Sequence, residues 1–263
     1  MAEITAKMVK ELRDATGAGM MDAKKALTEA DGDMEAARQI LREKGLAKAE
    51  SRSDRQNDEG TVAIARSDRA AALVQLKCET DFSAKSEAFV DLAREMAEAV
   101  LERGPDAVEE FKDRIDDLRL TIKENIEVGA VERVEAGPDE EIDVYLHQQE
   151  GRGVNGVIVV GRGVPAENLH QVALHIAFAR PTYLSRDEVP ADEVERERAA
   201  LLEITKAEGK PEAAWDKIVE GRLRGWFGER VLLDQGLHGD KTPVADSLGG
   251  GEIVRFVQVV IGA

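Results

Sequence analysis

The chain has 263 residues, of which 43% are hydrophobic and 34% charged, a composition typical of a folded protein with two or more domains. The formal net charge of −17 repels phosphate groups, which argues against direct nucleic-acid binding and against docking on anionic membranes. The single cysteine, Cys78, excludes an intrachain disulfide and a cysteine-based metal cluster.

The hydropathy of the chain bears on its location. No apolar run approaches the roughly 20 residues that cross a bilayer. The stretch "MAEITAKMVKELRDAT" is amphipathic and lacks the apolar centre of a signal peptide. These features predict a cytoplasmic protein in a reducing compartment.

Residues 1–46 have the pattern of a compact module of three short helices. Ile4, Met8 and Leu12 recur every four residues and define a first helix, which the stretch "TGAG" ends. "MMDAKKALTEA" predicts a second helix, and "DGD" provides the cap for a third. Residues 47–60 have no apolar periodicity and predict a mobile linker.

The rest of the chain repeats one order of elements: hairpin, helix, strand. The predicted elements are a hairpin of 61–65 and 71–78, helical segments 86–102 and 105–126, a strand 127–136, a hairpin of 141–149 and 154–161, a helix 167–179 and a strand 252–262. We therefore expect an α+β fold in which two similar subdomains, residues 61–138 and 139–263, have antiparallel sheets.

An insertion at 187–228 interrupts the second subdomain. Two helix-length stretches joined by "GKP" predict a protruding antiparallel helical hairpin. The apolar residues expected to face one another are Leu201, Leu202 and Ile204 on the first helix and Trp215, Ile218 and Leu223 on the second. Such an arm suits either a contact with a partner or a homodimer contact.

The sequence has no recognisable motif for nucleotide binding, metal binding or a catalytic nucleophile. "GAGMMDAKK" follows a helix and lacks a third glycine, so it does not predict a phosphate-binding loop. The histidines at 147, 170, 175 and 238 do not have metal-ligand spacing. Cys78 lacks a nearby base and fits a small buried thiol better than a nucleophile. We expect neither an enzyme nor a bound cofactor.

The stretch "KCETDFSAKSEAF" raises a specific question. Phe82 stands beside Asp81 in a turn that follows a predicted strand, where an aromatic ring usually has no core to join. One interpretation is that the ring folds back and packs on Phe89 as a helix cap. The other is that the turn presents an acid and a ring to a partner.

Two dense motifs and the order of elements resemble the elongation factor Ts family. The motifs are "VKELRDATGAGMMDAKKALTEADGDMEAA" and "CETDFSAKSEAF". "HIAFARPTYLSRDEVP", and "EGKPE" with the later "KIVEGRLRGWF", match the family's second subdomain and helical hairpin. Members of this family are guanine-nucleotide exchange factors for the translational GTPase elongation factor Tu.

The resemblance implies that the chain binds elongation factor Tu in its GDP-bound and nucleotide-free forms and promotes GDP release. It implies that the three-helix module is similar to ubiquitin-associated domains and docks on the GTPase domain. The implied contact residues are Leu12, Met20, Met21 and Lys24 in the module, Thr80, Asp81, Phe82 and Ser83 in a turn that enters near the magnesium site, His147 against the partner's third domain, and Leu237 against its GTPase domain.

Some positions depart from the family pattern or leave alternatives open. Ser83 stands where valine is commoner and Ala23 where cysteine is commoner. Adjacent helical residues point in different directions, so one of Met20 and Met21 is expected in the module's core. The module alone would also fit a ubiquitin-type peptide adaptor.

Overall fold

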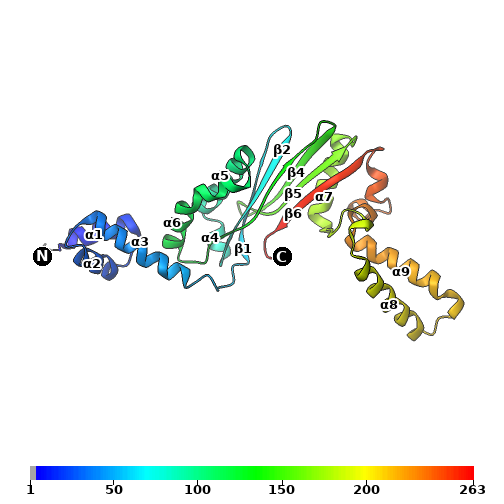
Figure 1. The fold of residues 1–263 in the computed structure, drawn as a ribbon, viewed down its shortest axis with the longest axis horizontal. Coiled ribbons are helices and arrows are strands. Elements are labelled where there is room, and N and C mark those ends of the chain that lie inside the picture. Colours follow the sequence, from blue (N-terminus) through cyan, green and yellow to red (C-terminus); the bar gives the residue numbers. More distant parts are fainter. Residues whose placement is uncertain (1–3) are drawn as a thin grey trace.

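The computed structural model describes residues 4–263, apart from the side chains of residues 46–50. Figure 1 shows an elongated molecule, with a three-helix region at one end, two sheets in the middle and a pair of helices projecting at the other end. None of the helices within residues 4–263 is both long and apolar enough to cross a bilayer.

The three-helix region consists of α1 (Ala6–Thr16), α2 (Met20–Glu29) and α3 (Met34–Glu50). Local chemistry sets the ends of these helices. The Thr5 hydroxyl accepts a hydrogen bond from the Met8 amide and caps α1, and Gly17 ends it in the left-handed conformation at φ 66°. The core of this region consists of Val9, Leu12, Ala23, Ala26, Leu27 and Ala37. The predicted N-terminal three-helix arrangement is confirmed.

The segment that joins this region to the sheets differs from the prediction. α3 continues to Glu50, so residues 47–50 are helical and do not belong to an irregular linker. The following segment is hydrogen-bonded to the first subdomain: the Asn57 amide group donates to Glu127 at 2.9 Å. An ion pair between Arg42 and Asp113 at 2.8 Å also joins α3 to α6 (Lys112–Ile122).

Two three-stranded antiparallel sheets form the centre of the molecule, as predicted. In each sheet a hairpin supplies two strands and a later segment adds the third beside the hairpin's second strand. The strands are β1 (Glu59–Arg66), β2 (Ala70–Cys78) and β3 (Glu127–Glu135) in the first sheet, and β4 (Glu140–Gln149), β5 (Arg152–Arg162) and β6 (Glu252–Val260) in the second. The repeated order of elements is therefore confirmed.

The sheets and their helices form four layers. α5 (Glu87–Arg103) packs on the first sheet and α7 (Ala166–Ala179) on the second, while the other faces of the two sheets pack together. Because β2 is covered on both faces, it is apolar at nearly every position: Val74 and Leu76 face α5, and Leu73 faces the second sheet. A buried strand of this kind is a rigid base for the residues that follow it.

The segment after α5 is less regular than the single helical stretch predicted for 105–126. It begins as a 3-10 helix over Pro105–Phe111 and continues as α6. Lys123 ends α6 in the left-handed conformation, at φ 65° and ψ 31°. The chain then runs to β3 without helical structure.

The insertion contains α8 (Ala191–Ala207) and α9 (Trp215–Arg230), which lie side by side away from the sheets (Figure 1). Their contact includes the buried residues Thr205 and Leu223 and an ion pair between Arg222 and Glu208. The prediction for Ile204 is wrong: its side chain is 49% exposed, because Thr205 takes the inward position.

The short remaining helices are the single turn α4 (Asp81–Ala84) and 3-10 turns at Arg186–Glu188, Glu212–Ala214, Leu232–Asp234, Leu237–Gly239 and Val244–Ser247.

Candidate functional site

The residues of the predicted partner-binding turn, Thr80–Ser83, follow the end of β2 after one residue, Glu79. Thr80 has an extended backbone (φ −127°, ψ 148°), and its hydroxyl accepts a hydrogen bond from the Ser83 amide at 3.3 Å. Thr80 is therefore the N-cap of α4, and the sequence Thr-Asp-Phe-Ser forms a single helical turn. We refer to Thr80–Ser83 as the fingertip turn.

Phe82 projects from the fingertip turn into solvent. Its side chain is 84% exposed, whereas Phe89 is fully buried in the core beneath α5. The interpretation that Phe82 folds back onto Phe89 is therefore wrong. Because exposing a phenyl ring to water is unfavourable, a ring held outside its own core is available to fill a pocket in another molecule.

Asp81 lies beside Phe82 and is also exposed. Its carboxylate accepts a hydrogen bond from the ammonium group of Lys85 at 2.6 Å. This bond, followed by the Coulombic attraction of Lys85, lowers the pKa of Asp81. Lys85 also forms an ion pair with Glu150 in the turn between β4 and β5. The fingertip turn of the first subdomain is thus connected to the second subdomain.

Thr80 and Ser83 hold the turn in place. Ser83 is 7% exposed, and its hydroxyl donates to the Glu124 carboxylate at 2.6 Å. The Thr80 hydroxyl donates to the same oxygen at 2.7 Å. The sequence did not reveal Glu124, because this residue lies more than 40 positions along the chain and belongs to no local motif.

Cys78, the last residue of β2, is fully buried. Burial, with a contribution from the negative charge of Glu124, raises the pKa of its thiol to about 12. The thiol therefore stays protonated at neutral pH, which confirms the prediction of an inert core cysteine.

In the three-helix region, Met20 and Met21 begin α2 and are 48% and 65% exposed. The prediction that one of them lies in the core is wrong, because Ala23 takes the inward position and is fully buried. Lys24 is exposed, as a contact residue must be. Leu12 is fully buried among the three helices, so its side chain supports the region from inside and does not form its surface.

His147 lies on β4 with an exposed side chain. Its ring stacks on Tyr145, with ring centroids 6.4 Å apart, and its Nδ1 lies 3.3 Å from the Tyr145 hydroxyl. Leu237 is half-buried and packs against the core beneath α7.

A buried histidine fixes the loop that carries Leu237. The Nδ1 atom of His175 accepts a hydrogen bond from the His238 amide at 3.1 Å, and its Nε2 atom lies 2.9 Å from the Gln235 side-chain oxygen. Nε2 must therefore donate, so the ring is neutral. Burial lowers the pKa of His175.

The sequence itself shows which family these features belong to. A family model described as "Elongation factor TS" matches residues 79–263, from the fingertip turn to the last strand. The chain belongs to the elongation factor Ts family. Full-length relatives agree, and each is named "Elongation factor Ts". The protein of Clavibacter sepedonicus is 43% identical over all of both chains. That of Cutibacterium acnes (strain DSM 16379 / KPA171202) is 46% identical over 98% of this chain and 99% of its own.

A more distant relative, from Lactiplantibacillus plantarum, is 38% identical over all of this chain and 93% of its own. Family membership implies a translation elongation factor that acts in nucleotide exchange on elongation factor Tu.

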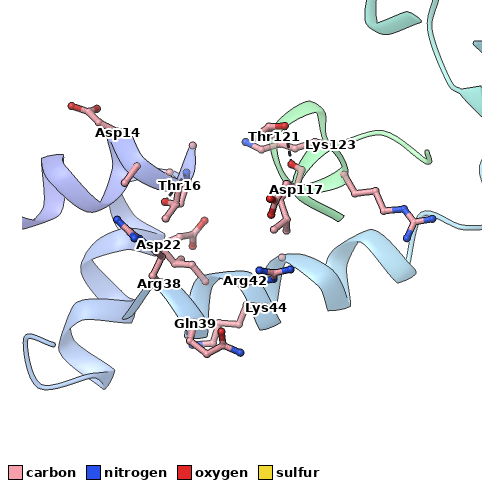
Figure 2. A pocket seen from close by; sticks show the side chains of 18 of the residues that line it. Asp14, Thr16, Asp22, Arg38, Gln39, Arg42, Lys44, Asp117, Thr121 and Lys123 are labelled. Carbon is pink, nitrogen blue, oxygen red and sulfur yellow. Dashed lines mark hydrogen bonds between the residues drawn. The ribbon is translucent and has the colours of Figure 1, made fainter. Parts of the chain in front are cut away.

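A groove of about 1110 Å³ separates the three-helix region from α6 (Figure 2). Figure 2 shows Asp22, Arg38 and Arg42 on one wall and Asp117 and Lys123 on the other. Several of its basic side chains already pair with carboxylates: Arg38 with Glu35, Arg42 with Asp113, Lys44 with Glu29 and Arg119 with Asp116. Four of the seven basic side chains that line the groove are thus paired with carboxylates, and the groove marks the boundary between the three-helix region and the first subdomain.

Proposed function

We propose that this chain promotes GDP release from elongation factor Tu by inserting the fingertip turn near the partner's magnesium site. The observation that carries the proposal is the exposure of Phe82 on a turn anchored to a buried strand. A rigid support and a free ring are the two properties that a side chain needs to enter another protein's pocket without losing much conformational entropy.

Exchange of this kind depends on thermodynamic linkage between nucleotide binding and factor binding to the same partner. A protein that performs no chemistry on the nucleotide accelerates its release by binding the nucleotide-free partner more tightly than the GDP-bound partner. The coupling is reciprocal: the factor weakens GDP binding by the same ratio by which GDP weakens binding of the factor. A thousandfold change corresponds to about 4 kcal/mol.

Phe82 can supply a large part of that free energy. Burying a phenylalanine side chain contributes roughly 1.5–3 kcal/mol, which is one to two powers of ten in an equilibrium constant. The ring contributes to exchange only if its pocket is better formed in the nucleotide-free partner. The remainder has to come from Asp81 and from the surfaces on either side of the turn.

Asp81 adds a negative charge where a bound magnesium ion balances the charge of the GDP phosphates. Its lowered pKa means that the carboxylate is ionised at neutral pH. A carboxylate at that place competes for the metal's water ligands or repels the diphosphate. Either effect weakens GDP binding without a covalent step.

Contacts on both sides of the fingertip turn hold the chain on elongation factor Tu, so that the turn reaches the magnesium site. Met20, Met21 and Lys24 form an exposed surface at the start of α2, which suits docking on the GTPase domain by a module similar to ubiquitin-associated domains. His147 and Leu237 are the corresponding contacts in the second subdomain. Leu12 supports the first of these surfaces from within the core.

The role of the arm formed by α8 and α9 stays a prediction, either as a partner contact or as a homodimer contact. Light scattering on a chain without residues 187–228 distinguishes the two. Loss of a homodimer would halve the ratio of the measured mass to the mass of one chain, while an unchanged ratio would leave the arm as a partner contact.

The proposed function is tested by mixing the full chain with elongation factor Tu that carries a fluorescent GDP. We expect the chain to accelerate loss of fluorescence in the presence of excess unlabelled nucleotide. A release rate that stays at the spontaneous value at every concentration of the chain would overturn the proposal.

A further inference from the structure

The carboxylate of Glu124 is saturated by donors from the fingertip turn and the residue before it. Oε1 accepts from the hydroxyls of Thr80 and Ser83 at 2.7 and 2.6 Å. Oε2 accepts from the backbone amides of Glu79 and Thr80 at 3.0 and 3.1 Å. A carboxylate has about four acceptor positions, so these four donors use all of them. Hydrogen bonds to an ionised acceptor are also stronger than neutral ones.

Residues 79–83 and residues 124–125 bind each other in both directions. The Glu79 carboxylate accepts a hydrogen bond from the backbone amide of Asn125 at 2.7 Å. The side chain of Asn125, which is 5% exposed, donates to the carbonyls of Ser53 and Arg55 at 3.1 and 2.9 Å. Residues 124 and 125 thus hold the fingertip turn and also the segment that leads from the three-helix region.

Lys123, the residue before Glu124, turns the chain out of α6 toward the fingertip turn. Lys123 has a left-handed conformation, at φ 65°, which is unfavourable for a residue with a side chain. It ends α6, so that the next two residues leave the helix and reach the fingertip turn. The Lys123 amide closes this helix end by donating to the Arg119 carbonyl at 3.2 Å, and Glu124 and Asn125 bind the chain directly after it.

We infer that Glu124 is a positioning residue for the exchange reaction, an inference that rests on the proposed function. α4 is a single helical turn, and one isolated turn is unstable without tertiary support. Phe82 is mostly in solvent, so the backbone of the turn sets the direction of its ring. Glu124 fixes that backbone before the partner binds, which removes the entropic cost of ordering the turn in the complex.

The test uses Glu124→Ala and the more conservative Glu124→Gln in the full chain. The maximal rate of GDP release is measured separately from the concentration that gives half of it. We expect Glu124→Ala to lower the maximal rate at least tenfold and Glu124→Gln to lower it less. The half-maximal concentration should change less than threefold, because the flanking surfaces are intact. Glu87→Ala, which removes an exposed carboxylate at the start of α5, is the matched control and should change neither quantity.

The double variant Glu124→Ala/Phe82→Ala separates positioning from general stability. If Glu124 acts by aiming the turn, its removal should change the rate several-fold at most once the ring is absent, because only Asp81 then remains to be positioned. Effects that multiply in the double variant, or wild-type rates for both Glu124 variants while Phe82→Ala is slow, would overturn the inference. A wild-type rate for Phe82→Ala alone would instead overturn the proposed function. If Glu124→Ala does not fold, Glu124→Gln carries the test.

Discussion

The ammonium group of Lys85 lies 2.6 Å from the carboxylate of Asp81, which precedes it in the chain by four residues. The residue proposed to disturb a magnesium site therefore already has a cationic partner in the free protein. Because Lys85 also pairs with Glu150, it can remain bound to the second subdomain when Asp81 approaches the metal. This arrangement makes the contribution of Asp81 testable through the metal.

The first prediction concerns Asp81 and magnesium. Asp81→Ala should slow stimulated GDP release several-fold at millimolar free Mg²⁺, because the variant lacks the carboxylate that competes for the metal's water ligands. The defect should shrink when a chelator lowers free Mg²⁺, since there is then less metal to displace. Release rates measured across a magnesium titration check this, and a defect of constant size would show that Asp81 does not act on the metal.

The second prediction separates surface from core in the three-helix region. Met20→Ser/Met21→Ser should weaken binding to elongation factor Tu while changing the free energy of unfolding by no more than about 0.5 kcal/mol per residue. Leu12→Ala should instead destabilise this region by about 2–5 kcal/mol, because Leu12 is fully buried. Calorimetric binding and thermal unfolding distinguish the two. Equal losses of stability in both variants would contradict the placement of the methionines.

The third prediction concerns pH and the loop that carries Leu237. Burial lowers the pKa of His175, so the neutral ring is favoured in the folded state. Its contribution to stability is complete above the unfolded-state pKa of about 6.5 and is lost as the pH falls below that value. Urea unfolding should show a smaller free energy at pH 5.5 than at pH 7.5. In His175→Gln this difference should shrink, and an undiminished difference would assign it to other groups.

The fourth prediction concerns Cys78. A thiol with a pKa of about 12 is ionised in roughly one molecule in ten thousand at pH 8, and this thiol is also buried. The folded protein should therefore react with a thiol reagent orders of magnitude more slowly than the protein unfolded in guanidinium chloride. Rapid labelling of the folded chain would show that the end of β2 opens readily.

The sheets could be predicted from the sequence because their signals are local. Alternating or continuous apolar runs, such as the one over β2, mark strands wherever one or both faces are buried. The exposure of Phe82 could not be decided from pattern alone, because a ring beside a helix start can pack on that helix or point away. The resemblance to a family favoured the second outcome, and the structure shows it.

The predictions that were wrong concern choices between neighbouring residues. Helical periodicity predicts which residues face the core only to within one position. In the arm, Thr205 faces inward and Ile204 is exposed. At α2, Ala23 fills the core and leaves both methionines outside. Glu124 was missed because its link to the fingertip turn is made by folding alone, across α5 and α6.

The most direct test of the account is the maximal rate of GDP release with Phe82→Ala and Phe82→Leu at saturating concentrations. Because the ring is 84% exposed, neither variant should alter the free energy of unfolding by more than about 0.5 kcal/mol. We predict a rate lower by roughly 10- to 100-fold for alanine and an intermediate rate for leucine, which retains part of the buried area. A wild-type maximal rate for Phe82→Ala, with binding intact, would contradict the claim that this ring drives exchange.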